Sequence, residues 1–183
     1  MRRVQVLDAR GVARALERMA AELVESVGDE KLLYLVGVQT RGVPLARRLA
    51  ELVADTTGHE PPVGALDISL YRDDVGPWRA AHQQPVLRDT ALPAAIDDKV
   101  ICLVDDVLYT GRTVRAALDT LMDYGRPRAI RLAVLVDRGH RELPVAADFV
   151  GRTVPTSRED DVQVRLKESD EEEGVWIARE VEE

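Results

Sequence analysis

The segment that most constrains the fold is residues 101–113, which read ICLVDDVLYTGRT. An apolar run of strand length leads into two adjacent carboxylates, Asp105 and Asp106, and a short loop with hydroxyl residues and a glycine precedes a helical pattern. Apolar strands that alternate with amphipathic helices predict an α/β fold with a parallel sheet. Open α/β sheets bind ligands beyond the carboxyl ends of their strands. We therefore expect the acidic pair to lie at a ligand site.

The rest of the chain repeats this alternation. Apolar runs predict strands at residues 32–38, 63–70, 100–104 and 130–136, and helical spacing predicts helices at residues 9–27, 44–54 and 113–124. Short strands are expected at residues 4–7 and within 145–154, and a hairpin at 162–167 and 174–178. Residues 72–96 lack periodicity, and so long a loop in a compact domain is usually functional or disordered. Since no linker interrupts the pattern, we expect one domain over residues 1–183.

Composition limits the classes of protein to consider. Hydrophobic residues make up 45% and charged residues 32% of the chain, as in ordinary soluble proteins. No apolar run approaches the roughly 20 residues that cross a bilayer, and the single cysteine, Cys102, cannot form an internal disulfide. We therefore expect a cytoplasmic protein with no membrane partner. The net charge of -8 argues against non-specific nucleic-acid binding but leaves room for a local basic face.

The acidic pair and the loop after it suit a sugar phosphate. Carboxylates accept hydrogen bonds from ribose hydroxyls and can hold Mg²⁺ directly or through water, which gives roles to Asp105 and Asp106. The loop N–H groups and the hydroxyls of Thr110 and Thr113 precede a helix, whose positive end favours a phosphate. Gly111 lets the backbone approach that phosphate closely. The alternative is a helix cap in a solvated turn, which needs only one acid.

A second anion site is expected at Thr40, Arg41 and Gly42, which also connect an apolar strand to a helix. Beside the first site, this connector suits a pyrophosphate, with Arg41 supplying positive charge. Alone, the pattern is equally that of an ordinary strand-to-helix turn. Arg72, at the start of the long loop, is placed to close over the pyrophosphate and exclude water.

These motifs resemble the phosphoribosyl-pyrophosphate (PRPP) signature of type I phosphoribosyltransferases. Residues 66–74, 107–115 and 132–144 are similar to the PyrR family, whose members are bifunctional pyrimidine-operon attenuators with uracil phosphoribosyltransferase activity. The segment LAVLVDRGHRELP at 132–144 is the most specific of the three. The resemblance runs from about residue 9 to 177. It implies a type I phosphoribosyltransferase fold: an open, mostly parallel sheet flanked by helices, with a mobile loop at about 72–96. A small hood would be built by about residues 137–183 and the N-terminal segment.

The resemblance implies that uracil and PRPP react to give UMP and pyrophosphate, with Mg²⁺ as the cofactor. In this reading Asp105, Asp106 and Arg72 are the catalytic residues, and the two acids hold the ribose hydroxyls. The 5-phosphate would lie in a cradle of Tyr109, Thr110, Gly111, Arg112 and Thr113, the pyrophosphate at Thr40, Arg41 and Gly42, and the uracil under Val136, Asp137, Arg138, Gly139 and His140. Asp137 is a candidate general base, but a structural role is equally open.

The resemblance also implies binding of a hairpin in pyr messenger RNA, controlled by UMP or UTP. The RNA-binding residues would be Arg18, His140, Arg141 and Arg152. At positions where family members carry hydroxyl, histidine or basic residues, this chain has Glu17, Ala21, Val27 and Ala146. Each lost phosphate contact weakens RNA binding. Homodimers or larger homo-oligomers are also implied.

Three hypotheses remain from the sequence. The chain is an active uracil phosphoribosyltransferase, with or without RNA binding. It is a nucleotide-sensing RNA-binding regulator with little enzymatic activity. It has another base specificity, such as a purine, which the sequence at 132–144 argues against.

Overall fold

The computed structural model describes residues 2–68 and 90–179, and of Arg2 only the backbone. Arg72 and most of the loop predicted at residues 72–96 lie outside the described residues. None of the helices in the described ranges is both long and apolar enough to cross a membrane.

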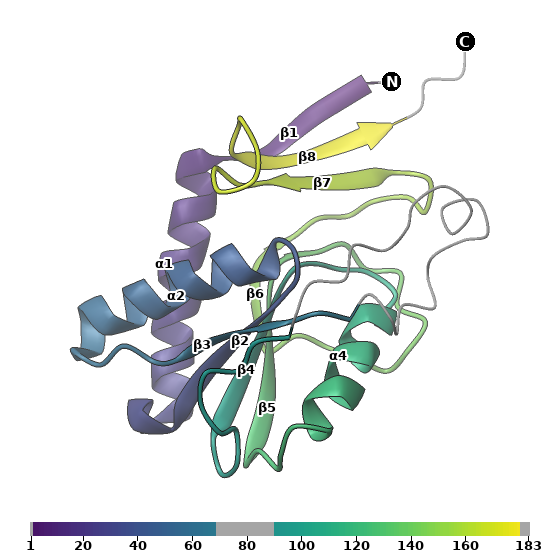
Figure 1. Cartoon of the computed structure of the whole chain (residues 1–183). Coiled ribbons are helices and arrows are strands. Elements are labelled where there is room, and N and C mark those ends of the chain that lie inside the picture. Colours follow the sequence, from purple (N-terminus) through teal and green to yellow (C-terminus); the bar gives the residue numbers. More distant parts are fainter. Residues whose placement is uncertain (1, 69–89, 180–183) are drawn as a thin grey trace.

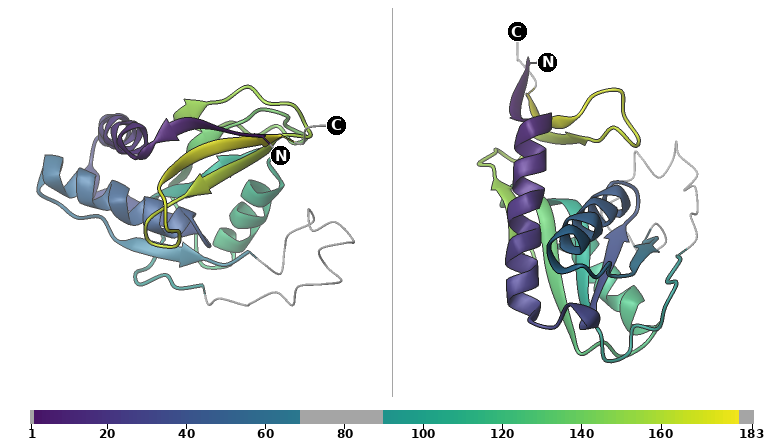
Figure 2. Two further views of the ribbon diagram at one scale, coloured as in Figure 1. Left: turned by 90° about the horizontal axis from the view of Figure 1, so that it is seen from above. Right: turned by 90° about the vertical axis from the view of Figure 1, so that its left-hand side faces the viewer.

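The main sheet has five parallel strands in the order β3-β2-β4-β5-β6 (Figure 1). They are β2 (Leu33–Val38), β3 (Val63–Leu66), β4 (Val100–Leu108), β5 (Ala129–Asp137) and β6 (Phe149–Thr153). Helices α1 (Ala9–Val27) and α2 (Gly42–Thr57) cover one face, and α4 (Arg112–Met122) covers the other (Figure 2). Because both faces are covered, the central strands are continuous apolar runs. The predicted α/β fold is confirmed.

Cys102 lies on the α1 and α2 side of this core and is fully buried. Burial, together with the negative charge of Asp148, raises the pKa of its thiol. The thiol is therefore inert at neutral pH, as its place in an apolar run suggests.

Several predicted boundaries were wrong by a few residues. β4 continues to Leu108 because β5 pairs with it beyond the apolar run, so Asp105 and Asp106 lie within the strand. α2 has Pro44 in its first turn, as predicted, but it ends at Thr57 rather than near residue 54. β3 ends at Leu66, and α4 ends at Met122, with Asp123 at its C-cap in place of the predicted stop at residue 125.

A second, antiparallel sheet has the order β1-β8-β7. It consists of β1 (Arg2–Asp8), β7 (Asp161–Arg165) and β8 (Gly174–Arg179). The predicted hairpin therefore exists, and its partner is the N-terminal strand. β6 belongs to the main sheet, where it pairs with β5. The small sheet lies beside the carboxyl end of β4, from which the chain enters α4 (Figure 1). Val162 of β7 and Thr113 of α4 accordingly line the same cavity.

Candidate functional site

A cavity of about 400 Å³ lies at the carboxyl ends of β2 and β4. It brings together residues predicted from three separate motifs: Thr40, Arg41, Asp105, Asp106, Tyr109, Thr113 and Arg138. Gln39, Ile68 and Val162 also line it and were not predicted. The position agrees with the expectation that ligands of α/β sheets bind beyond the strand ends.

The acidic pair lies where β4 and β2 separate. β2 pairs with β4 only as far as Val104, whereas β5 continues alongside β4 to Leu108. Asp105 is 8% exposed, and its Oδ1 accepts a hydrogen bond of 2.9 Å from the Asp106 N–H. The Asp106 Oδ1 in turn accepts one of 2.8 Å from the Val107 N–H. These backbone bonds hold both side chains at the cavity, and a carboxylate is an acceptor suited to hydroxyl donors.

The loop after β4 has the backbone expected of a phosphate cradle. Gly111, the N-cap of α4, has φ +93°, a conformation that favours glycine. The N-cap residue has no capping side chain, and among the described residues the Arg112 N–H already donates to the Thr110 hydroxyl at 3.3 Å. The next first-turn N–H groups, those of Thr113 and Val114, are the donors that an anion can use. The loop is anchored by Thr110, whose carbonyl accepts hydrogen bonds from the N–H groups of Glu142 (3.0 Å) and Leu143 (3.2 Å).

The predicted cradle contributes two of its five members to the cavity lining, Tyr109 and Thr113. The Arg112 side chain pairs with Glu142, at 3.0 Å between Nε and Oε2, on the protein surface. A phosphate in the cradle therefore depends on the first-turn N–H groups after Arg112 and on the Thr113 hydroxyl.

The connector between β2 and α2 packs very closely on β4. A Cβ atom on Gly42 would lie 2.3 Å from the carbonyl oxygen of Val104, so only glycine fits there. The connector is also held by the Gln39 N–H, which donates to the Leu66 carbonyl at 2.9 Å, and the Gln39–Thr40 peptide bond is cis. This packing brings Thr40 and Arg41 beside the acidic pair.

In the Arg41 guanidinium, one nitrogen donates hydrogen bonds and another, which is buried, has no acceptor among the described residues. Its Nη2 donates to Asp170, at 3.0 Å to Oδ1 and 3.3 Å to Oδ2. Its Nε is buried and has no hydrogen-bond partner among residues 2–68 and 90–179. An unsatisfied buried donor costs about 1–3 kcal/mol, and an anion in the cavity would supply the missing acceptor.

Asp137 is held in a salt bridge rather than free to take a proton. Its carboxylate accepts hydrogen bonds from the Arg141 guanidinium and from the Gly139 N–H, the latter at 2.9 Å. Burial alone would raise the pKa of Asp137, but the bonds to Arg141 and Gly139 outweigh it, so its pKa lies below the ordinary value. This geometry favours the structural alternative over a general base.

The segment after β5 is fixed to residues 156–160. The Arg138 guanidinium lies 4.1 Å from the centre of the Tyr109 ring and donates to the carbonyls of Ser157 (2.9 Å) and Asp160 (2.8 Å). His140 Nε2 lies 2.7 Å from the Thr156 carbonyl. Of the five residues predicted to contact uracil, only Arg138 lines the cavity.

The four predicted RNA contacts differ in availability. Arg18 of α1 donates to Glu22 and to the carbonyls of Val150 (3.0 Å) and Gly151 (2.7 Å), the two residues that precede the exposed Arg152 in β6. Arg141 donates to the Tyr109 carbonyl at 2.7 Å as well as to Asp137, so its donors are largely occupied. Arg18 and Arg141 therefore have most of their donors occupied within the protein, whereas the Arg152 side chain is exposed.

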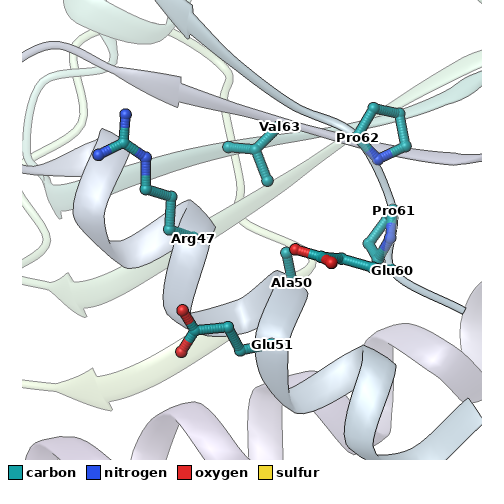
Figure 3. A pocket seen from close by; sticks show the side chains of 7 residues that line it. All are labelled: Arg47, Ala50, Glu51, Glu60, Pro61, Pro62 and Val63. Carbon is teal, nitrogen blue, oxygen red and sulfur yellow. The ribbon is translucent and has the colours of Figure 1, made fainter. Parts of the chain in front are cut away.

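A second hollow, of about 410 Å³, lies elsewhere, between α2 and the segment that leads into β3 (Figure 3). Arg47 and Glu51 of α2 face it from one side, and Glu60 and Pro62 from the other. It is at the amino end of β3 and contains none of the predicted site residues.

Comparison with known proteins agrees with the geometry. A family model described as a phosphoribosyl transferase domain matches residues 3–169. The hypoxanthine phosphoribosyltransferase of Trypanosoma cruzi has the same fold, with a TM-score of 0.71 and 17% identity over 96% of this chain and 95% of that one. A hypoxanthine-guanine phosphoribosyltransferase from Bacillus anthracis gives a TM-score of 0.71 and 15% identity, covering 96% and 97%. The fold is thus that of the type I phosphoribosyltransferases.

Relatives of higher sequence identity show which family of phosphoribosyltransferases the chain is part of. The chain is 55% identical to the bifunctional protein PyrR of Pelotomaculum thermopropionicum, over 96% of this chain and 95% of that protein. It is 54% identical to PyrR of Thermus thermophilus (96% and 95% covered) and 49% identical to PyrR of Clostridioides difficile (96% and 97% covered). The chain belongs to the PyrR family.

Proposed function

We propose that the chain transfers the phosphoribosyl group of PRPP to uracil, giving UMP and pyrophosphate, and that it regulates pyrimidine biosynthesis genes by nucleotide-dependent binding of pyr messenger RNA. The observation that carries the enzymatic part is the cavity in which Asp105 and Asp106 lie beside the α4 N-terminus and the Arg41 connector. Its three kinds of group match the three parts of PRPP: hydroxyls, a 5-phosphate and a pyrophosphate.

In this mechanism the protein positions the reactants and stabilises charge. Asp105 and Asp106 hold the ribose hydroxyls, and the first-turn N–H groups of α4 hold the 5-phosphate. Arg41 stabilises the negative charge that develops on the departing pyrophosphate. The transition state is oxocarbenium-like, and orientation of uracil against the ribose accounts for much of the acceleration. Arg72 and the long loop, which lie outside the described residues, are proposed to exclude water.

Mg²⁺ fits this site as a partner of the substrate. Phosphoribosyltransferases generally use Mg²⁺ with PRPP, and the ion neutralises pyrophosphate charge when bound. Within the described residues no three His, Cys, Asp or Glu side chains form a metal-binding group. Mg²⁺ commonly binds through one or two carboxylates plus substrate oxygens and water, which is what Asp105 and Asp106 can supply.

The base would lie under the segment after β5, with residues 136–140 and the small sheet as the hood. Arg138 is the proposed hood residue nearest the cavity, because its guanidinium is fixed over Tyr109. A purine specificity is tested directly by comparing UMP formation from uracil with nucleotide formation from hypoxanthine, each with PRPP and Mg²⁺. We expect turnover with uracil, and turnover with hypoxanthine alone would overturn the uracil assignment.

For RNA, the proposed surface is the part of α1 and β6 that carries Arg18 and Arg152. Binding should be stronger with UMP and should weaken steeply with salt, because phosphate contacts release counterions. A titration of a pyr leader hairpin with and without UMP at two salt concentrations tests this. Binding that does not respond to UMP would remove the regulatory part and leave the enzyme. The protein is proposed to act in the cytoplasm as a homodimer or larger homo-oligomer.

A further inference from the structure

The turn that joins β7 to β8, residues 166–173, lies against the N-terminal half of α2 (Figures 1 and 2). It carries five acidic residues, and we refer to it as the acidic turn. It meets Arg41 at the N-cap of α2 and Arg48 two turns further along. Residues seven apart lie on the same face of a helix, so one turn reaches both.

Arg48 anchors the acidic turn to α2. Its Nε and Nη2 donate to the two carboxylate oxygens of Glu168 at 2.8 and 2.7 Å. Its Nη1 and Nη2 donate to those of Glu173 at 2.8 and 3.1 Å, and the Glu173 side chain is only 8% exposed. Two bidentate pairs give a geometrically specific attachment. The turn therefore has an attachment to α2, through Arg48, that does not depend on its contact with Arg41.

Asp170 is held by its own turn before it meets Arg41. Its Oδ2 accepts hydrogen bonds of 3.0 Å from the Leu166 N–H and 3.0 Å from the Ser169 hydroxyl. Its backbone N–H donates to the Leu166 carbonyl at 2.7 Å. The side chain is 18% exposed, so the pair with Arg41 is less screened by water than a surface salt bridge. Asp170 is a fixed acceptor.

We propose that Asp170 is a positioning residue, which holds the Arg41 guanidinium at the pyrophosphate end of the cavity. The proposal rests on the proposed function, since it assigns a partner to the pyrophosphate-binding arginine. Asp170 occupies Nη2, while the buried Nε still lacks an acceptor among the described residues. An arginine that is already ordered loses less side-chain entropy when the anion binds.

The test compares Asp170→Asn with a control from the same turn. Glu172→Gln removes a carboxylate that pairs with Arg3 and Arg165 instead of α2. For Asp170→Asn we expect kcat/KM for PRPP to fall about tenfold, the low end for a hydrogen bond between charged groups. The KM for uracil should change little. The thermal midpoint should fall only slightly, since the asparagine can still accept from the Leu166 N–H and Ser169 hydroxyl and Arg48 still anchors the turn. Glu172→Gln should keep kcat/KM for PRPP within about twofold of the wild type.

A double-mutant cycle separates positioning from a general structural role. If Asp170 acts through Arg41, then Asp170→Asn should cause no further loss in an Arg41→Gln background. Equal losses in both backgrounds, an unchanged kcat/KM, or tighter PRPP binding by Asp170→Asn would each overturn the proposal.

Calorimetric titration of the full-length protein with PRPP and Mg²⁺ gives a second readout that needs no turnover. A wild type that makes no UMP but binds PRPP would defeat the proposed activity, while the PRPP affinities of the variants would still decide the role of Asp170.

Discussion

Gly42→Ala should reduce catalysis strongly, whereas a glycine variant of similar stability loss at the other end of α2 should not. The new Cβ would lie 2.3 Å from the Val104 carbonyl oxygen, about 1 Å closer than the 3.4 Å at which ordinary contact begins. Both partners are backbone, so the connector must move by roughly that amount. Overpacking of this kind costs about 1–3 kcal/mol of folding free energy. A displacement of about 1 Å in a group that positions a substrate can cost about 100-fold in rate.

The matched control is Gly58→Ala at the other end of α2. Gly58 has φ +76°, and an added Cβ would meet nothing within 4 Å. Alanine in this left-handed conformation costs about 1–2 kcal/mol, a loss similar to that expected at Gly42, but far from the cavity.

The assay measures kcat/KM for PRPP together with urea unfolding of both variants. We expect comparable losses of stability and a loss of kcat/KM, about 100-fold, only in Gly42→Ala. If Gly42→Ala retained wild-type kcat/KM while losing stability, the close packing of the connector on β4 would have no part in binding the pyrophosphate, and the reasoning would be refuted.

Three further predictions follow from the site and the acidic turn. Asp105→Asn should lower kcat/KM for PRPP by about 10–100-fold, because a buried acceptor of the ribose hydroxyls loses its charge, and steady-state kinetics with an unchanged value would contradict the ribose assignment. Arg48→Gln leaves the carboxylate of Glu173, which is 8% exposed, without its partner, so the free energy of unfolding measured with urea should fall by about 1–3 kcal/mol. Glu168 is more exposed and adds little to this loss. An unchanged free energy of unfolding would mean that Arg48 does not anchor the acidic turn. Asp137 and Asp170 have lowered pKa values in the folded state, so their ionised carboxylates stabilise the fold fully above the unfolded-state pKa of about 4, and this stabilisation is lost as pH falls through the folded values. The free energy of unfolding, measured with urea from pH 7 to pH 3, should therefore fall in that acid range in the wild type. It should fall less in an Asp137→Asn variant.

The sequence predicts most of the architecture because apolar periodicity reports burial. The four central runs became strands of one parallel sheet, and the alternation in Val162, Val164 and Leu166 correctly indicated a hairpin with residues 174–178. The end of β4 was misplaced because Asp105, Val107 and Leu108 pair through their backbone with β5, and hydrophobicity carries no signal of pairing by an acidic residue.

The site residues that belong to short sequence motifs could be predicted. The contacts between residues far apart in the sequence were missed. Four of the predicted residues in the strand-to-helix connectors line one cavity: Thr40, Arg41, Tyr109 and Thr113. The pairing of Arg41 with Asp170 spans 129 positions of the chain, and an acidic run reads as a solvated turn unless the fold is known. The same holds for Arg141, which the resemblance implies as an RNA contact but which bonds Asp137 and the Tyr109 carbonyl.

The most direct test of the account is a crystal structure of the protein with UMP. We expect the ribose hydroxyls within hydrogen-bond distance of the Asp105 and Asp106 carboxylates, and the 5-phosphate against the first-turn N–H groups of α4. A nucleotide bound with its ribose away from both carboxylates, for example in the hollow beside Arg47, would contradict the central claim.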